Sequence, residues 1–303
     1  MPFQFIKNDI AKVRADALVN AVNPLLKGSA DGCAPSEAKL IEGIEGYALP
    51  CRYVIHAAAP QWRGGDHGEH KLLASCYRLA LMLAEEHGCE SAVFSLIFFR
   101  GHGSPKEEAL EIAVREIGAF LRKSDMMVYL AVSDQTVIQI REPIFAEIEE
   151  ALESRPIFGM RECLLPSEEA RESTAPAKFS KRAIEEALAV GGETFSELLL
   201  RKIDERGMTD VECYKKANID RKHFSKIRSD RSYRPSKNTV LAFAIALELT
   251  PEETDEFLAR AGFAFSSASR FDIIVEYFIN RGIYDIYEIN EALFAFGEKQ
   301  IGP

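Results

Sequence analysis

The chain has 303 residues, 47% of them hydrophobic and 28% charged, and this composition predicts a folded protein with room for two domains. Its net charge of −10 would argue against nucleic-acid binding only if the acidic residues were evenly spread, and they are not. No apolar run approaches the ~18 residues of a membrane span. The first residues have neither the basic start nor the apolar length of a signal peptide, so we expect a cytoplasmic protein without a membrane partner.

The six cysteines are scattered, without a CxxC pair or the Cys/His spacing of a zinc site. We therefore expect reduced, structural thiols, no metal and no cofactor. His67 and His70 suggest a ligand pair with Cys33 or His56, but a solvated polar loop is the better interpretation. The cysteines are Cys33, Cys51, Cys76, Cys89, Cys163 and Cys213.

The first strong signal is the apolar run from Ala17 to Val22, which Asn20 interrupts and Asn23 ends. So short a run, followed by turn residues, predicts a buried strand. In an open parallel sheet ligands bind outside the carboxyl ends of the strands. Asn23 and the small-residue loop Gly28–Gly32 are thus predicted to hold a phosphate or a sugar.

Four separated motifs resemble the macrodomain family of ADP-ribose-binding α/β modules. They are Asp9-Ile10, the run Asp16–Asn23, Ala30-Asp31-Gly32, and Gly46–Pro50 followed by Tyr53–His56. The resemblance covers roughly the first half of the chain. It implies a mostly parallel sheet flanked by helices, with ADP-ribose or a related nucleotide as ligand.

The resemblance also implies roles for single residues. Asp9 would receive the adenine amine and Asn23 the distal ribose, while backbone amides of Gly28–Gly32 and Gly101–Gly103 would cradle the phosphates. The predicted ligand-binding residues are Asp9, Ile10, Asn20, Asn23, Gly28, Ser29, Asp31, Gly32, Gly101, His102 and Gly103.

Asn23 and Asp31 are also the candidate catalytic residues, because the family's hydrolases place an Asn and an acidic residue at these positions. A carboxamide can orient a ribose, and a carboxylate near a diphosphate can position or deprotonate water. The alternatives are a strand-end cap for Asn23 and a turn former for Asp31.

The chain departs from the family pattern in two places. About one helix is missing between Gly32 and Cys33, and Lys27, Ser29 and Ala30 stand where the family has glycines. These changes predict a trimmed pocket and favour binding, or a scaffold, over catalysis.

A second ligand loop is predicted further along the chain. The apolar run from Ser91 to Phe99 predicts a central strand, and Ser104–Glu107 has the form of a capping box that opens a helix through Phe120. A strand, a glycine turn and a helix N-terminus are typical of an anion site. Arg100 within this loop either pairs with a diphosphate or blocks the groove.

The first domain is predicted to end near residue 153. Met127–Val132 predicts a further strand and Glu142–Leu152 a helix that closes the domain, and the alternation of strands and helices indicates an α/β fold. Residues 154–184, punctuated by prolines, predict a linker.

Residues 185–303 predict an all-α second domain. Thr209 or Asp210 caps one short helix, and another follows at Arg221–Ser229. This pair resembles the repressor-type helix-turn-helix, whose second helix enters the major groove of double-stranded DNA. Further helices are capped by Ser236 and by the capping box that starts at Thr250.

Charge agrees with that resemblance. From Lys215 to Lys237 we count nine basic and two acidic residues, a local charge of +7. The alternative is a solvated basic face on a protein-binding bundle. The predicted DNA-binding residues are Arg221, Lys222, His223, Lys226 and Arg228.

The tail from Arg270 to Phe296 predicts two amphipathic helices with more apolar surface than a small bundle needs to bury. We therefore expect a partner interface or a homodimer contact there. Three functions follow from the sequence: an ADP-ribose-binding module that controls a DNA-binding regulator, an ADP-ribosyl or O-acetyl-ADP-ribose hydrolase with a binding tail, and a degenerate macrodomain scaffold.

Overall fold

The computed structural model describes residues 3–7, 10, 13–22, 38–42, 51–101, 104–132, 142–154, 193–230 and 233–302. Its first half is built on a six-stranded sheet of order β1-β6-β5-β2-β4-β3, in which every neighbouring pair is parallel except β3 and β4. The strands are β1 (Phe3–Lys7), β2 (Ala17–Val22), β3 (Ala38–Glu42), β4 (Tyr53–Ala58), β5 (Ser91–Ser95) and β6 (Met127–Val132).

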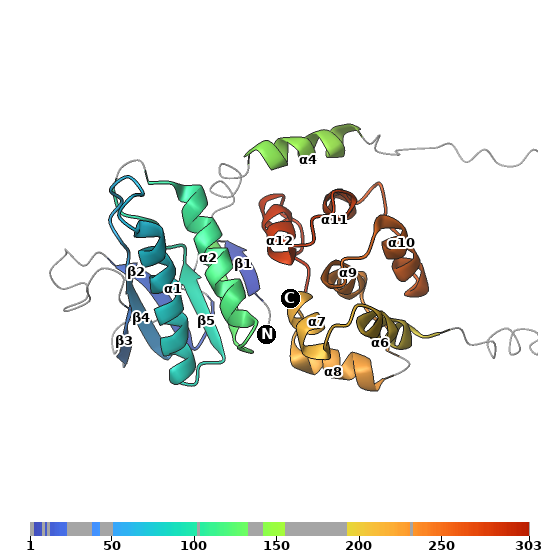
Figure 1. The fold of residues 1–303 in the computed structure, drawn as a ribbon, viewed down its shortest axis with the longest axis horizontal. Helices are drawn as coiled ribbons and strands as arrows, with labels where there is room; N and C mark the ends of the chain where they lie inside the picture. Colours follow the sequence, from blue (N-terminus) through green and yellow to red (C-terminus); the bar gives the residue numbers. More distant parts are fainter. Residues whose placement is uncertain are drawn as a thin grey trace, which may run out of the picture.

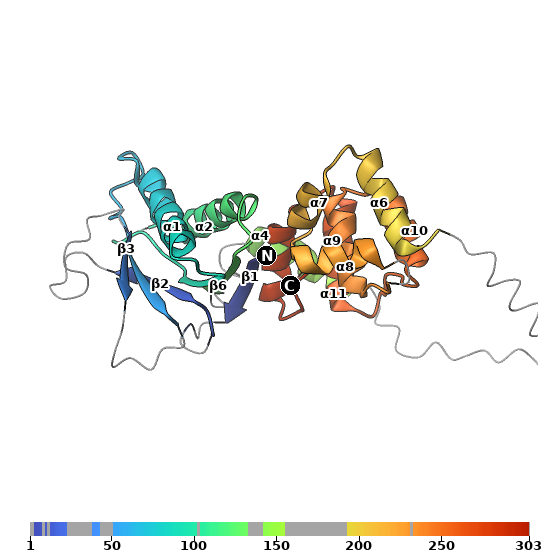
Figure 2. The ribbon, with the colours of Figure 1, turned by 90° about the horizontal axis from the view of Figure 1, so that it is seen from below.

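Two helices, α1 (Glu69–Glu86) and α2 (Lys106–Leu121), lie side by side on one face of the sheet (Figure 2). Alternation along each strand sorts the side chains between the two faces. In β2, Ala17 and Val19 join the main core with the helices, whereas Leu18 joins a smaller cluster on the other face. The predicted α/β class is confirmed.

The second ligand loop differs from its prediction at both ends. β5 ends at Ser95, earlier than predicted, because the chain then turns inward: the Ile97 amide donates to the Tyr77 hydroxyl (2.9 Å). Pro105, rather than Ser104, is the N-cap of α2, and no side chain bonds to that cap. The predicted capping box is therefore wrong, since Ser104 stands one residue too early.

The second half is a bundle of helices (Figure 1). Thr194, Thr209 and Thr250 each form a capping box with the glutamate three residues on, and Ser236 caps the central helix as predicted. The helices after the sheet are α4 (Glu142–Ser154), α6 (Phe195–Glu205), α7 (Asp210–Lys216), α8 (Arg221–Ser229), α9 (Lys237–Ala246), α10 (Pro251–Arg260), α11 (Arg270–Asn280) and α12 (Ile286–Ala295).

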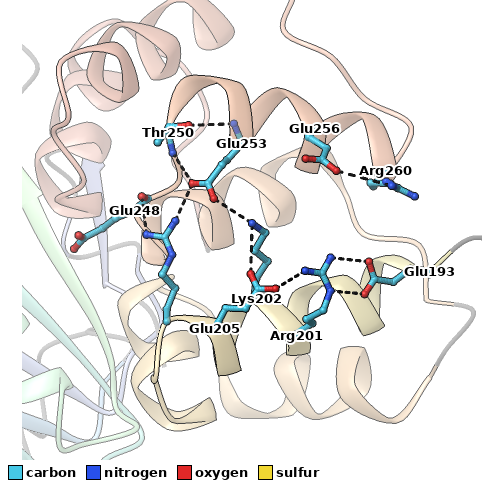
Figure 3. A network of polar contacts seen from close by, with 10 residues as sticks. Glu193, Arg201, Lys202, Glu205, Glu248, Thr250, Glu253, Glu256 and Arg260 are labelled. Atoms are coloured by element: carbon cyan, nitrogen blue, oxygen red, sulfur yellow. Dashed lines mark hydrogen bonds and ion pairs between the residues drawn. The ribbon is translucent and has the colours of Figure 1, made fainter.

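Ion pairs connect α6 to α10 on the outside of this bundle (Figure 3). Lys202 of α6 and Arg206, which caps that helix, both reach Glu253 of α10, at 3.1 and 2.8 Å, and Arg201 bonds to Glu193 at 2.8 Å. Because each of these cations has an acidic partner, the network stabilises the packing of helices and leaves little positive charge for a ligand.

Helix α4 packs against the helical half rather than closing the sheet half. Phe145 meets Phe296 with ring centroids 5.4 Å apart, and Glu147 accepts from the Tyr277 hydroxyl at 2.6 Å. The predicted helix itself is confirmed, over Glu142–Ser154. The boundaries at residues 153 and 184 stay predictions, since residues 155–192 lie outside the described part of the chain.

The two halves share one core, and β1 lies at the junction. Phe3 of β1 packs against Tyr287 of α12 (5.4 Å between ring centroids), and Phe5 against Phe294 (5.8 Å). Gly118 of α2 lets α12 approach closely, because a Cβ there would lie 2.9 Å from the Tyr287 ring. The buried side chains form a continuous cluster across the junction.

Among the described strands β1 pairs only with β6, and two carboxamides cover its other edge. Asn218 accepts from the Phe3 amide (2.7 Å) and donates to the Phe3 carbonyl (3.0 Å). Gln300 does the same for Phe5, at 2.9 and 2.7 Å. Each side chain thus takes the place of a peptide group of a neighbouring strand, and β1 is hydrogen-bonded on both edges.

This junction also accounts for the apolar tail. Ile274, Phe278, Leu293 and Phe294 are buried within the chain, against β1, α4 and the other helices. The surplus that suggested a homodimer is therefore covered without a second copy.

The remaining sequence expectations concern the cysteines, membrane spans and metal sites. Cys51, Cys76, Cys89 and Cys213 are free thiols there, while Cys33 and Cys163 lie outside the described ranges. Across those ranges no helix is both long and apolar enough to cross a bilayer, and no cluster of three metal-ligating side chains is found.

Candidate ligand edge and basic face

The carboxyl ends of the parallel strands define the candidate ligand edge. β2 and β5 are neighbours in the middle of the sheet; the chain leaves β2 toward the β4 side and leaves β5 toward β6. Such a reversal is a topological switch point, where open α/β sheets bind ligands. The residues that follow Val22 and those that follow Ser95, which are the two predicted ligand loops, both start at this point.

Three of the predicted ligand residues lie in the described part. Asn20 is exposed in β2, Ile10 is half-buried against the smaller cluster, and Gly101 has a φ of 111°, a conformation that favours glycine. The others, Asp9, Asn23, Gly28, Ser29, Asp31, Gly32, His102 and Gly103, lie outside the described residues.

Arg100 is anchored in the loop after β4. Its Nε donates to the Ala59 carbonyl (2.7 Å), its amide donates to Pro60 (2.9 Å), and its carbonyl accepts from Trp62 (2.6 Å). The sequence suggested that Arg100 either pairs with a diphosphate or blocks the groove. It did not predict these hydrogen bonds to the loop after β4. Arg100 holds the loops after β4 and β5 together next to the switch point.

A buried carboxylate fixes the loop after β4. Glu69, only 2% exposed, accepts from the amides of Arg63 (3.0 Å), Gly65 (3.3 Å) and His67 (2.8 Å). Burial opposes the charged form, but these backbone donors and its own amide outweigh it and lower the pKa of Glu69 to about 2. The carboxylate is therefore charged at neutral pH and holds the loop against α1.

The basic face on α8 is partly neutralised by neighbours. Lys216 pairs with Glu248 at 2.5 Å, Lys215 with Asp125 at 3.5 Å, and Arg228 with Asp210. All of these acidic partners lie outside the +7 stretch, so the sequence count overstates the available charge. Lys237 is likewise paired, with the buried Asp272.

Four exposed cations in that stretch have no acidic partner among the described residues. We refer to this set as the α8 cations: Arg221, Lys222, Lys226 and Arg234. Phe224 and Ile227 pack inward as expected. His223, predicted to face DNA, is half-buried and shares a hydrogen bond with the Tyr233 hydroxyl (2.6 Å), so its ring is engaged inside the protein.

Comparison with known proteins agrees with the sheet half. A mostly parallel α/β sheet with a central switch point belongs to a class of fold that binds ligands at that point, and the family model for the Macro domain matches residues 4–113. A Macro domain-containing protein of Methanosarcina mazei is 37% identical over 144 residues, covering 41% of this chain and 75% of the relative. The chain belongs to the Macro domain family through its N-terminal part.

Two further matches give the range of the similarity. An O-acetyl-ADP-ribose deacetylase of Citrobacter rodentium is 33% identical, covering 47% of this chain and 94% of the relative. A structure of the Oceanobacillus iheyensis macrodomain with ADP is 27% identical, with a TM-score of 0.40, covering 48% of this chain and 91% of that one.

Sequence reasoning missed the residues that build the scaffold of these sites. Glu69 was visible only as part of a polar loop, and Asn218 only as a turn position. Gln300 gives no local signal at all, because its partner Phe5 is 295 residues away.

Proposed function

We propose that the first half binds ADP-ribose or a related nucleotide and that the helical half binds double-stranded DNA, so that the chain is a nucleotide-responsive regulator. The observation that carries the nucleotide half is the switch point between β2 and β5 in a chain of the Macro domain family. The α8 cations support the DNA half, because they are exposed and lack acidic partners among the described residues.

A second candidate is hydrolysis at the same site. The deacetylase of Citrobacter rodentium and an ADP-ribose glycohydrolase of Xenopus laevis, 37% identical over 139 residues, are named for such reactions. In this reading Asn23 orients the distal ribose and Asp31 activates a water. We place it second because the loop that carries both residues has fewer glycines than the family pattern, and because the sequence predicts that the helix after it is missing.

We predict that the chain binds ADP-ribose and turns it over slowly or not at all. Loosely held loops cost catalysis more than binding, since a misplacement of ~1 Å can cost about a hundredfold in rate. In calorimetry, Asn23→Ala should weaken binding because the ribose loses its carboxamide partner. Asp31→Ala should leave affinity nearly intact.

A de-ADP-ribosylation assay on the same three proteins separates the alternatives. Rapid turnover that Asp31→Ala abolishes would establish the hydrolase and contradict the regulator. If no heat of binding is measured at millimolar ADP-ribose, both proposals fail and only the third function, a degenerate macrodomain scaffold, remains.

For DNA we predict that Lys222→Ala together with Lys226→Ala flattens the salt dependence of binding by about two units of log–log slope, about one for each lost phosphate contact. The measurement is fluorescence anisotropy of the full chain with a mixed-sequence duplex at several salt concentrations. The full chain is needed because the turn before α8 is bonded to β1.

Lys216→Ala is the matched control, since this lysine belongs to the same stretch but is paired with Glu248. We expect it to change the slope by clearly less than one unit. Absence of any affinity at low salt in the unmutated chain would contradict the DNA assignment.

A further inference from the structure

Two more exposed cations lie in the sheet half, on the turn that joins α2 to β6. Arg122 and Lys123 follow α2 directly, and neither has an acidic partner among the residues that the structure describes. They lie close behind residues 4–113, which match the Macro domain model, and far in sequence from the α8 cations. The sequence therefore gives no reason to group the two sets.

The fold brings this turn against α7. Lys215 of α7 donates to the Ser124 carbonyl (3.3 Å) and pairs with Asp125 (3.5 Å), with only 11% of its side chain exposed. Lys215 is therefore used to fasten the turn and is not available to a phosphate. In Figure 1 the end of α2 lies beside α7 at the junction of the halves.

The first residue of α8 is close to the same turn. The hydroxyl of Tyr214 is affected by a residue of the turn and by a residue of α8. Burial and then the charge of Asp125 raise the pKa of this hydroxyl, and the charge of Arg221 lowers it. Asp125 and Arg221 thus lie within electrostatic reach of one phenol. The turn that carries Arg122 and Lys123 and the start of α8 therefore both lie near Tyr214.

The relative position of the two sets is also fixed. Asn218, in the turn before α8, makes two hydrogen bonds to Phe3 of β1, and β1 pairs along its length with β6, which follows the basic turn. The turn and α8 are therefore connected by hydrogen bonds through the sheet as well as through Lys215.

We propose that Arg122 and Lys123 extend the α8 cations into one surface, shared by both halves, that binds the phosphate backbone of duplex DNA. The proposal rests on the DNA binding proposed above and adds the sheet half to the contact. Duplex DNA is favoured because its phosphates form extended, regularly spaced rows, which a rigid set of cations from separate elements can follow.

This surface does not overlap the ligand edge. The basic turn precedes β6 and so lies at the amino ends of the parallel strands, whereas the ligand edge is at their carboxyl ends. A six-residue strand separates the two by about 20 Å. DNA and a nucleotide can accordingly be bound at the same time.

The test compares double variants of the full chain by anisotropy with a mixed-sequence duplex over a range of salt concentrations. Arg122→Ala with Lys123→Ala should lower the log–log slope by up to about two units. The charge-preserving pair Arg122→Lys with Lys123→Arg should retain the wild-type slope. The matched control is Lys71→Ala with Lys106→Ala, which removes the same charge near the first residues of α1 and α2. The first residue of α2 is about 24 Å from the basic turn, the length of the helix.

The outcomes are distinct. An unchanged slope for the Arg122 and Lys123 pair, beside a reduced one for Lys222 and Lys226, would overturn this inference and leave the proposed DNA binding in place. A wild-type chain without affinity for duplex would overturn both. Equal losses in the control pair would show a net-charge effect, and tighter binding of single-stranded RNA or of an acidic protein would overturn the assignment to duplex DNA.

Discussion

Replacing Asn218 with alanine is expected to lower the free energy of unfolding by about 3–5 kcal/mol. The carboxamide is 3% exposed and satisfies both the amide and the carbonyl of Phe3. Each buried backbone group left without a partner costs about 1–3 kcal/mol. Alanine also has to adopt the left-handed conformation of this residue, φ 56°, at roughly 1–2 kcal/mol.

Two variants separate these causes in urea unfolding. Asn218→Gly loses the same hydrogen bonds but tolerates the left-handed conformation, so it should be more stable than the alanine variant by about 1 kcal/mol. Asn280→Ala, exposed at the end of α11, should stay within about 0.5 kcal/mol of the wild type. A loss below 1 kcal/mol for Asn218→Ala would contradict the role given to the carboxamide.

We also predict that a cavity in the helical half will destabilise the sheet half. Phe294, 5% exposed, packs on Phe5 across the junction, and truncation of a buried Phe to Ala costs about 3–5 kcal/mol. Trp62 is the single tryptophan, so its fluorescence follows the loop after β4. In Phe294→Ala, the Trp62 transition and the far-ultraviolet ellipticity should move together to lower denaturant.

Phe257→Ala is a stricter test of whether the two halves unfold together, because α10, which carries this side chain, lies farther from the sheet half (Figure 1). This side chain, 1% exposed in α10, packs against Phe195 inside the helical bundle and is not among the aromatic contacts to β1. If the shared core makes one cooperative unit, Trp62 responds to this change as well. A Trp62 transition that stays in place while the ellipticity shifts would show that the halves unfold independently.

Local patterns predicted the local structure well. The apolar run from Ala17 to Val22 is β2, and the capping box at Thr250 is present, because both depend on residues a few positions apart. The start of α2 was mispredicted by one residue, because Pro105 occupies the N-cap position that the sequence pattern assigned to Ser104. The end of β5 was mispredicted because the Ile97 amide, just after the strand, donates to the hydroxyl of Tyr77, a buried residue of α1.

The junction was beyond sequence reasoning for a different reason. Asn218 and Gln300 act on backbone groups more than two hundred residues away, and a carboxamide in a turn or a tail has the same local pattern whether or not it meets a strand. Likewise, the count of +7 included the charges of the stretch but not their acidic partners. Three of these partners, Asp125, Glu248 and Asp272, come from three other segments. Charge patterns predicted the place of the basic face and overestimated its strength.

The carboxamide cover on β1 has a consequence for the behaviour of the chain in solution. An uncovered edge strand offers a row of free amides and carbonyls, to which strands of other molecules can add, and proteins normally protect such edges against aggregation. Here the protection of the β1 edge comes from two side chains of the helical half. That half therefore keeps the sheet from polymerising through this edge, in addition to any role in binding.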